Sequence, residues 1–183
     1  MKKLLLTAVL AVFYVSSILS QENAFGISAG YSSLIAKAKV SYQGDSESDS
    51  DSAGGFYIGI FKEFDVNEKF TIRPEFQYAL YSSDGENSSE LLIPVLFKYE
   101  VAKSFSLMAG PQFDYMLEDD AEDFNKLGLG LTLGAEIDLI EKLFLNLRYS
   151  FGISERLAND EIIAPFEVDL RLDTFNLGLG YRF

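Results

Sequence analysis

The sequence predicts an all-β protein, an eight-stranded antiparallel transmembrane β-barrel with short periplasmic turns and long extracellular loops. Three observations lead to this prediction. Eight segments alternate between apolar residues and glycine, polar or charged residues. Their connections alternate between short and long, and the last alternating segment closes on an aromatic residue, Phe183. Eight apolar faces are too many for one soluble core, so we expect them to face lipid.

The first twenty residues have the pattern of a cleaved secretory signal peptide. Lys2 and Lys3 are followed by an almost uncharged apolar run and then by the small residue Ser20. A transmembrane helix is the alternative, but the run is shorter than the roughly 20 apolar residues that a span needs. We therefore assign residues 1–20 to the leader and 21–183 to one outer-membrane barrel domain. The chain has no cysteine, which excludes disulfides, thiolate metal sites and a lipoprotein anchor.

The first four strands are expected at 25–31, 56–61, 70–81 and 91–100. In the first, Phe, Ile, Ala and Tyr alternate with glycine and serine; in the second, Phe and Ile alternate with Tyr and Gly. The third is the clearest, because six apolar residues from Phe70 to Leu80 stand opposite a face that carries Arg73 and Glu75. The fourth places Lys98 and Glu100 on its polar face. This period of two residues is that of a β-strand.

The last four strands are expected at 105–115, 127–139, 143–154 and 175–183. Aromatic and leucine residues form one face of each, and the other face carries glycine, small polar residues and a few charges. The apolar faces contain no Lys or Arg, which would cost about 2–4 kcal/mol at the membrane midplane. The alternation changes phase near 33–35 and 173–174, which predicts a bulge or a strand that extends beyond the membrane.

The connections also fit a barrel whose two ends differ. Residues 66–69, 102–104 and 140–142 form short turns, whereas residues 43–54, 82–90, 118–125 and 155–167 form long polar loops. Aromatic residues gather at the strand ends and predict two interfacial girdles. One comprises Phe64, Phe70, Tyr99, Phe105 and Phe183, and the other Tyr31, Phe56, Tyr78, Tyr115 and Phe151. Simple β-propensity is the alternative explanation of these aromatics.

Charged residues on the inward faces predict an ionic network inside the barrel. The set comprises Glu63, Arg73, Glu75, Lys98, Glu100, Glu136, Asp138, Arg148 and Arg182. Five acids and four bases can nearly neutralise one another, and an unpaired buried charge would be costly. Because eight strands enclose a narrow lumen, we expect these residues to plug it. A gated or ion-conducting lumen is the functional alternative.

The long loops are rich in carboxylates. The residues concerned are Asp45, Glu47, Asp49, Asp51, Glu118, Asp119, Asp120, Glu122 and Asp123. Such carboxylates could share a calcium ion or bridge to lipid phosphates through divalent cations. The segment from Asp49 begins like an EF-hand loop, but Ala53 offers no ligand and Ile60 replaces the bidentate glutamate. We interpret these loops as solvated and mutually repelling, and we predict no metal or other cofactor.

Composition argues against two further function classes. The formal net charge of −13 disfavours nucleic acid, whose phosphates would repel the chain. The chain has no histidine, the usual proton carrier of outer-membrane hydrolases and acyltransferases, so we predict that it is not an enzyme. A soluble lipocalin-like barrel that binds an apolar ligand is a third class. It would need apolar residues inside, the reverse of what Arg73, Glu136 and Arg148 indicate.

Four segments carry a family resemblance: 25–31 (FGISAGY), 93–99 (IPVLFKY), 109–111 (AGP) and 176–183 (NLGLGYRF). They resemble small outer-membrane barrels of the PorT-like or outer membrane protein beta-barrel domain family of Bacteroidetes-type bacteria. The resemblance covers the whole mature chain and implies fold and location; the best-known relatives assist protein secretion. The ending with Tyr181 and Phe183 resembles the signal read by the barrel-assembly machinery.

We therefore expect an integral protein of the Gram-negative outer membrane with periplasmic termini and a structural or interaction role. That role would be membrane integrity, surface contact or support of protein secretion. The expected partners are outer-membrane lipid, the barrel-assembly machinery and secretion-system or surface proteins, and the expected state is a monomer. A small-solute or ion channel and the lipocalin-like barrel are the alternatives.

Overall fold

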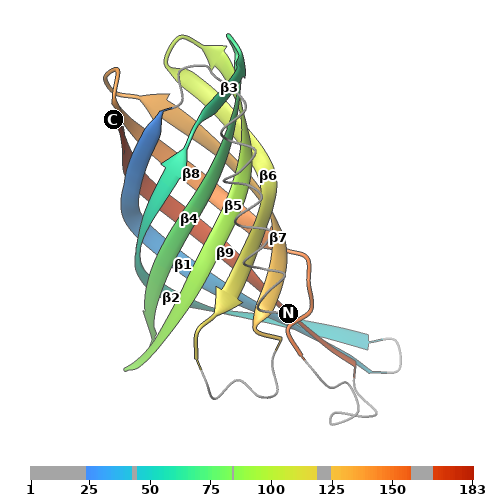
Figure 1. Cartoon of the computed structure of the whole chain (residues 1–183). Helices are drawn as coiled ribbons and strands as arrows, with labels where there is room; N and C mark the ends of the chain where they lie inside the picture. The colour runs from blue at the N-terminus through green and yellow to red at the C-terminus, as the bar shows by residue number, and fades with distance from the viewer. Residues whose placement is uncertain (1–23, 43–44, 84, 119–124, 158–166) are drawn as a thin grey trace, which may run out of the picture.

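The computed structural model describes residues 24–42, 45–83, 85–118, 125–157 and 167–183. These residues form a single antiparallel sheet that closes on itself (Figure 1). The strands are β1 (Phe25–Tyr42), β2 (Asp45–Lys62), β3 (Phe64–Asn67), β4 (Phe70–Ser83), β5 (Glu86–Ala102), β6 (Phe105–Met116), β7 (Leu127–Asp138), β8 (Leu143–Gly152) and β9 (Glu167–Arg182). The predicted signal peptide, residues 1–20, lies outside the described residues.

The nine segments fill eight positions in the ring. The order is β2-β1-β9-β8-β7-β6-β5-β4-β3, and pairing of β2 with β4 closes the barrel. Segments β2 and β3 share one position: Phe61 pairs with Glu75 and Phe64 pairs with Ile72 of the same strand β4. The pairing with β4 is interrupted only between Phe61 and Phe64. The prediction of an eight-stranded barrel is therefore confirmed.

The two ends of the barrel differ as the connection lengths predict. At the turn end, β3–β4, β5–β6 and β7–β8 are joined by short turns, and Phe183 N donates a hydrogen bond to Phe25 O (2.9 Å). The Asn67 side chain closes the first turn by accepting hydrogen bonds from Lys69 N and Phe70 N, both at 3.0 Å. The opposite end is the loop end, where strands β1, β4, β6 and β8 end.

Two of the four predicted long loops are wrong. Residues 43–54 lie mostly in strands, because β1 continues to Tyr42 and β2 already begins at Asp45. Asp45, Glu47, Asp49 and Asp51 therefore belong to strand β2 and not to a loop. Residues 82–90 form a tight hairpin instead, whose Gly85 has a φ of 87°, a conformation that glycine adopts without steric cost.

The predicted phase changes near 33–35 and 173–174 mark strand extensions. The register of β1 with β9 runs without a shift from Gly26↔Arg182 to Ser41↔Glu167. The apolar pattern ends there because beyond this point the sheet extends past the closed barrel, and neither of its faces contacts lipid. The two outer strands of the extension, β2 and β9, flank β1, and the extension projects from the loop end (Figure 1).

The outer surface is apolar and the interior polar, as the alternation predicts. Large apolar side chains are exposed around the ring, including Phe56 (74%), Leu133 (46%) and Leu179 (48%). Charged and amide side chains such as Arg73, Gln77 and Glu136 are buried inside. No helix long and apolar enough to cross a membrane occurs among the described residues. A soluble protein would bury an apolar surface of this extent, whereas here it is exposed around the ring.

Candidate functional site: the sealed lumen and its two ends

The turn end of the lumen is filled by a network of paired charges. Arg73 is its centre: its guanidinium pairs with Glu136 (2.6 Å) and with Glu63, and lies 3.7 Å from Glu75. The residue is 1% exposed and comes from β4, whose inward face it shares with Glu75. Bidentate pairing of this kind suits the planar guanidinium. Arg73 thereby ties β4 to β7 across the lumen.

Aromatic rings hold Arg73 in place from two sides. Its guanidinium carbon lies 4.8 Å from the ring centre of Phe61 and 4.7 Å from that of Phe144. Arg182 stacks on Phe144 at 4.3 Å. Both rings are buried, and glycine on the neighbouring strand makes room for them: a Cβ on Gly180 would collide with Phe144. Cation–π contacts of this kind are strongest where water is excluded.

The remaining members of the network surround this centre. Lys98 pairs with Glu63 (2.6 Å) and Glu136 (3.3 Å), and Arg182 pairs with Glu63 (2.9 Å) and Asp138 (2.7 Å). Arg148 pairs with Glu75 (2.7 Å). The structure thus joins eight of the nine charges that the sequence places in the lumen. The ninth, Glu100, is exposed at the rim of the turn end.

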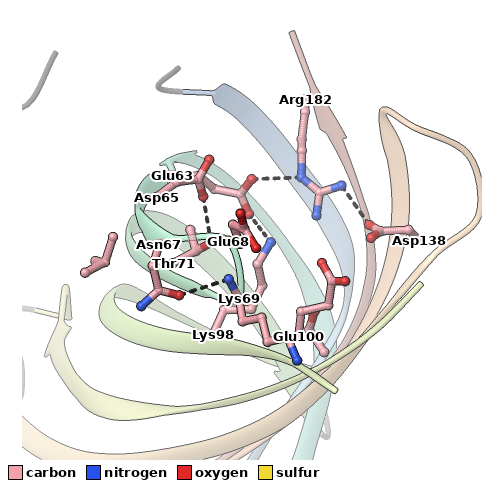
Figure 2. A pocket seen from close by; sticks show the side chains of 12 residues that line it. Glu63, Asp65, Asn67, Glu68, Lys69, Thr71, Lys98, Glu100, Asp138 and Arg182 are labelled. Atoms are coloured by element: carbon pink, nitrogen blue, oxygen red, sulfur yellow. Dashed lines mark hydrogen bonds and ion pairs between the residues drawn. The ribbon is translucent and has the colours of Figure 1, made fainter. Parts of the chain in front are cut away.

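A cup opens outward from this network at the turn end (Figure 2). Its volume is about 760 Å³, and it is lined mostly by charged and polar residues of β3, the β3–β4 turn and β5, together with Asp138 and Arg182. Figure 2 shows Arg182 reaching between Glu63 and Asp138 at one wall. The floor of the cup is the ionic network, so the cup does not continue as a bore.

The middle of the lumen is closed by uncharged polar groups. Tyr57 donates a hydrogen bond to Asn146 (3.3 Å), and Ser32 donates one to Asn176 (2.7 Å). A second chain runs through Gln112, which donates to Thr174 (3.0 Å) and accepts from Thr132 (3.3 Å). Tyr57 crosses the lumen above Gly178, where a Cβ would collide with the phenol oxygen. Side chains therefore fill the section, as expected for eight strands.

The loop end is closed by a residue that the sequence analysis missed. Arg156 follows β8, yet it is 2% exposed and its guanidinium pairs with Asp114 on β6. Its backbone is fixed as well: Arg156 N donates to Leu170 O (2.9 Å), and Arg156 O accepts from Asn125 N (2.7 Å). A Cβ on Gly128 would collide with the guanidinium. A basic residue in an otherwise acidic predicted loop, and a glycine opposite, were its only sequence signals.

The predicted acidic loop residues are dispersed. Glu118 is half-buried, and its carboxylate accepts a hydrogen bond from Ser89 N. Asp119, Asp120, Glu122 and Asp123 lie outside the described residues. Within the described part of the chain, no group of three or more acidic, histidine or cysteine residues has the geometry to hold a metal ion.

An ion pair also lies on the outer face of the loop end, beyond the apolar belt. Asp173 accepts hydrogen bonds from Lys37 Nζ (2.5 Å), Tyr149 Oη (2.7 Å) and Gly152 N (2.8 Å). The hydrogen bond to Asp173 raises the pKa of Lys37. Burial acts to raise the pKa of Asp173, but the bonds from Lys37, Tyr149 and Gly152 outweigh it and hold this pKa below its ordinary value.

The carboxyl terminus forms part of an aromatic group at the turn end. Phe183 is exposed, stacks on Phe25 with ring centres 6.0 Å apart, and meets Tyr181 edge-on at 5.5 Å. Both side chains face outward, as the alternation predicts. The structure thus presents the predicted assembly signal on the outer surface of the barrel.

A closed ring of strands with an apolar exterior and a polar, filled interior defines the class of transmembrane β-barrels. The family model described as "Outer membrane protein beta-barrel domain" matches residues 5–183. The chain belongs to this family, which places it in the outer membrane. A comparison with curated proteins found no match.

Solved structures with the same fold include small barrels from other bacteria. The attachment invasion locus protein Ail of Yersinia pestis has a TM-score of 0.51 and 17% identity, covering 89% of this chain and all (100%) of its own. OprG of Pseudomonas aeruginosa has a TM-score of 0.52 and 15% identity, covering 89% and 97%. The outer-membrane enzyme PagL has a TM-score of 0.50 and 13% identity, covering 82% and 98%. At these identities the similarity concerns the fold alone.

Proposed function

We propose that this protein is an integral outer-membrane barrel that acts through its exposed ends and its lipid-facing wall, not through its lumen. Its role is structural or interactive: membrane integrity, surface contact or support of protein secretion. Its termini and short turns face the periplasm, and its loop end faces the medium. Outer-membrane lipid and the barrel-assembly machinery are its general partners, and it is a monomer.

The closed lumen is the observation that carries this proposal. The Arg73 network, the Tyr57 and Gln112 layer and the Arg156–Asp114 pair succeed one another from the turn end to the loop end. Any solute crossing the barrel would have to break buried, charge-assisted hydrogen bonds in at least two of these layers. Such bonds are about twice as strong as neutral ones. The porin-like alternative has no comparable support.

Conductance across a planar bilayer tests the closed lumen directly. The refolded barrel, whose insertion is verified by different gel mobility of unheated and heated samples, should give no steady current. The matched variant Arg73→Ala/Arg148→Ala/Arg156→Ala removes two arginines of the turn-end network and the arginine that closes the loop end, and it should raise conductance. A steady current from the unmodified protein would overturn the proposal.

The absence of cysteine allows a clean test of orientation. Ser50→Cys places a thiol at the loop end, and Glu68→Cys places one at the rim of the cup. A membrane-impermeant maleimide applied to intact cells should label the first variant and spare the second, whereas broken cells should show both labelled. The reverse pattern in intact cells would refute the proposed orientation.

A catalytic role is not part of the proposal. PagL shares the fold and is an enzyme, but the present chain contains no histidine to carry a proton. The buried carboxylates Glu63, Glu75 and Glu136 are each paired with arginine or lysine. These carboxylates are therefore engaged by side chains of the barrel itself. The lipocalin-like alternative is disfavoured by the apolar exterior and the charged interior.

The PorT-like resemblance supports one version of the interactive role, assistance to protein secretion. Proteins that share this task would meet the barrel at its periplasmic cup or within the membrane. Photo-crosslinking in whole cells from the cup rim, at Glu68 or Glu100, followed by identification of the attached protein, tests this version. Recovery of lipid alone from both positions would contradict it.

A further inference from the structure

One strand edge on the loop end has no neighbour. Strand β2 pairs with β1 along its whole length, from Asp45 to Lys62. Its other edge pairs with β4 only from Gly54 to Phe61, because β4 ends at Ser83. Among the described residues, the stretch from Asp45 to Ala53 therefore has one paired and one open side. This open edge lies on the hairpin that projects from the barrel (Figure 1).

The direction of the backbone groups on this edge follows from the register. Glu63 N donates to Ala24 O (2.7 Å), and the β1–β2 register is constant, so odd-numbered residues of β2 exchange hydrogen bonds with β1. The backbone N–H and C=O of the even-numbered residues point away from β1. In the unpaired stretch these residues are serines, at 46, 48, 50 and 52. The open edge thus presents a regular row of donors and acceptors beside small side chains.

Two of these backbone donors already form hydrogen bonds with aspartate side chains of β2. Ser50 N donates to Asp49 Oδ1 (2.8 Å), and Ser52 N donates to Asp51 Oδ1 (2.7 Å). This local bonding gives the alternating acid–serine sequence a physical reason. A charged, self-capped edge resists pairing with apolar strands, which is how exposed edges avoid aggregation. An incoming strand with basic side chains can pair with these carboxylates. Its backbone C=O groups can then accept the hydrogen bonds of the Ser50 and Ser52 amides in place of the aspartates.

The side chains specify the charge of that partner. Glu47, Asp49 and Asp51 are exposed and lie on one face, with a repeat of about 6.6–6.8 Å set by two residues of strand. The residues paired with them across β1 are Val40, Ala38 and Ala36, which carry no charge. No base of β1 therefore stands opposite these acids. An added strand has the same side-chain repeat, so lysine or arginine at alternate positions would meet each acid in turn.

We propose that the open edge of β2 takes up an extended polypeptide segment with basic residues at alternate positions, added to the sheet as one more strand. Edge addition supplies affinity through the backbone, and the acid row supplies selectivity. The proposal deepens the surface-contact role and rests on the proposed orientation for its biological setting. Binding by the purified barrel does not depend on orientation, so the two can fail separately.

The test measures binding of a labelled nine-residue peptide of alternating lysine and threonine to the detergent-solubilised full barrel by fluorescence anisotropy. The control peptide has the same side chains but N-methylated backbone amides throughout, so it keeps its charge and has no N–H to donate from either edge. We expect saturable binding of the first peptide and loss of binding by the second. Equal affinity for both would overturn strand addition.

Three variants separate edge pairing from charge. Ser50→Pro removes one open-edge donor, together with its bond to Asp49, but leaves every acidic residue in place. Proline is tolerated on edges, so we expect about a tenfold loss of affinity. Asp49→Asn keeps the cap on Ser50 and removes one charge, with an expected loss of about fivefold. Glu141→Gln removes an exposed charge at the turn end and should change nothing. Gel mobility with and without heating verifies that each variant is folded.

The outcomes that contradict the proposal are distinct. Unchanged affinity in both Ser50→Pro and Asp49→Asn would show that the peptide binds elsewhere. An equal loss in Glu141→Gln would show attraction by overall charge alone. Calcium binding to the same acids, without any peptide binding, would assign the row to a cation and overturn the strand partner.

Discussion

Replacement of Arg73 by methionine should be among the most destabilising single changes in the barrel wall. Methionine approximates the length of the side chain but removes two close ion pairs, to Glu136 and Glu63, and two ring contacts at 4.7–4.8 Å. Removal of one partner from a buried ion pair costs about 3–5 kcal/mol. Each desolvated cation–π contact contributes about 1 kcal/mol more.

Two features reduce the expected cost. Lys98 and Arg182 remain beside the same carboxylates, so neither acid loses all of its positive neighbours. The methionine side chain also keeps favourable contact with the rings of Phe61 and Phe144. We therefore expect Arg73→Met to lower the free energy of unfolding by about 4 kcal/mol, close to a thousandfold in the folding equilibrium.

The measurement is equilibrium urea unfolding in phospholipid vesicles. The chain has no tryptophan, so the folded fraction is best read from the band of an unheated sample on a denaturing gel. Arg171→Met is the matched control: it breaks an exposed pair with Asp169 and should cost less than about 1 kcal/mol. The double variant Arg73→Met/Glu136→Gln should recover part of the lost free energy of unfolding, because it also removes the Glu136 carboxylate that Arg73 paired with. A cost below about 0.5 kcal/mol for Arg73→Met would refute the reasoning and indicate a hydrated lumen.

Three further changes probe other parts of the molecule. Gly178→Val forces the ring of Tyr57 from its place and should lower the free energy of unfolding by about 1–3 kcal/mol in the same vesicle assay. Asp173→Asn should destabilise the barrel by about 1 kcal/mol at neutral pH. Because the folded pKa of Asp173 is lowered, this carboxylate stabilises the fold above its ordinary pKa. The difference between wild type and variant should therefore vanish as the pH falls through the folded value, and a difference constant down to acid pH would contradict this. Phe183→Ala leaves the ladder intact, so refolding in vitro should be unchanged while the amount assembled in cells falls; equal assembly in cells would exclude an assembly role.

Much of the barrel could be predicted from sequence because lipid solvates its outer wall. The apolar side chains of β4 and β7 alternate without exception where they meet hydrocarbon. The faces, eight of the nine charges assigned to the lumen and the eight-stranded ring were therefore predicted correctly. The hairpin at Asp45 was not, since both of its faces meet water. Its acid–serine alternation has the period of a strand but no apolar contrast, and hydrophobic periodicity therefore could not detect it.

Long-range pairing was the other part that the sequence left undetermined. The inward parity of Arg73, Glu136 and Arg148 follows from alternation, but their mutual distances depend on the strand register and the barrel cross-section. Arg156 shows the limit most clearly, because it lies beyond the end of β8 at Gly152 and still fills the lumen beside Asp114. No local pattern distinguishes it from an exposed loop arginine.

The distribution of charge separates stability from recognition. Within the lumen, Glu63, Glu75, Glu136 and Asp138 are matched in number by Arg73, Lys98, Arg148 and Arg182, so that network is neutral. The net charge of −13 must then lie elsewhere, and part of it is the acid row of β2.

Salt should act differently on these two sets of charges. Exposed charges are screened within about 8 Å at physiological ionic strength and within about 3 Å at 1 M, whereas buried pairs are screened much less. Raising the salt from 0.1 to 1 M should therefore weaken binding of the alternating lysine peptide strongly and leave the cost of Arg73→Met nearly unchanged. If that cost fell in parallel with the peptide affinity, ions would have access to the Arg73 network, and the lumen would be open to solvent.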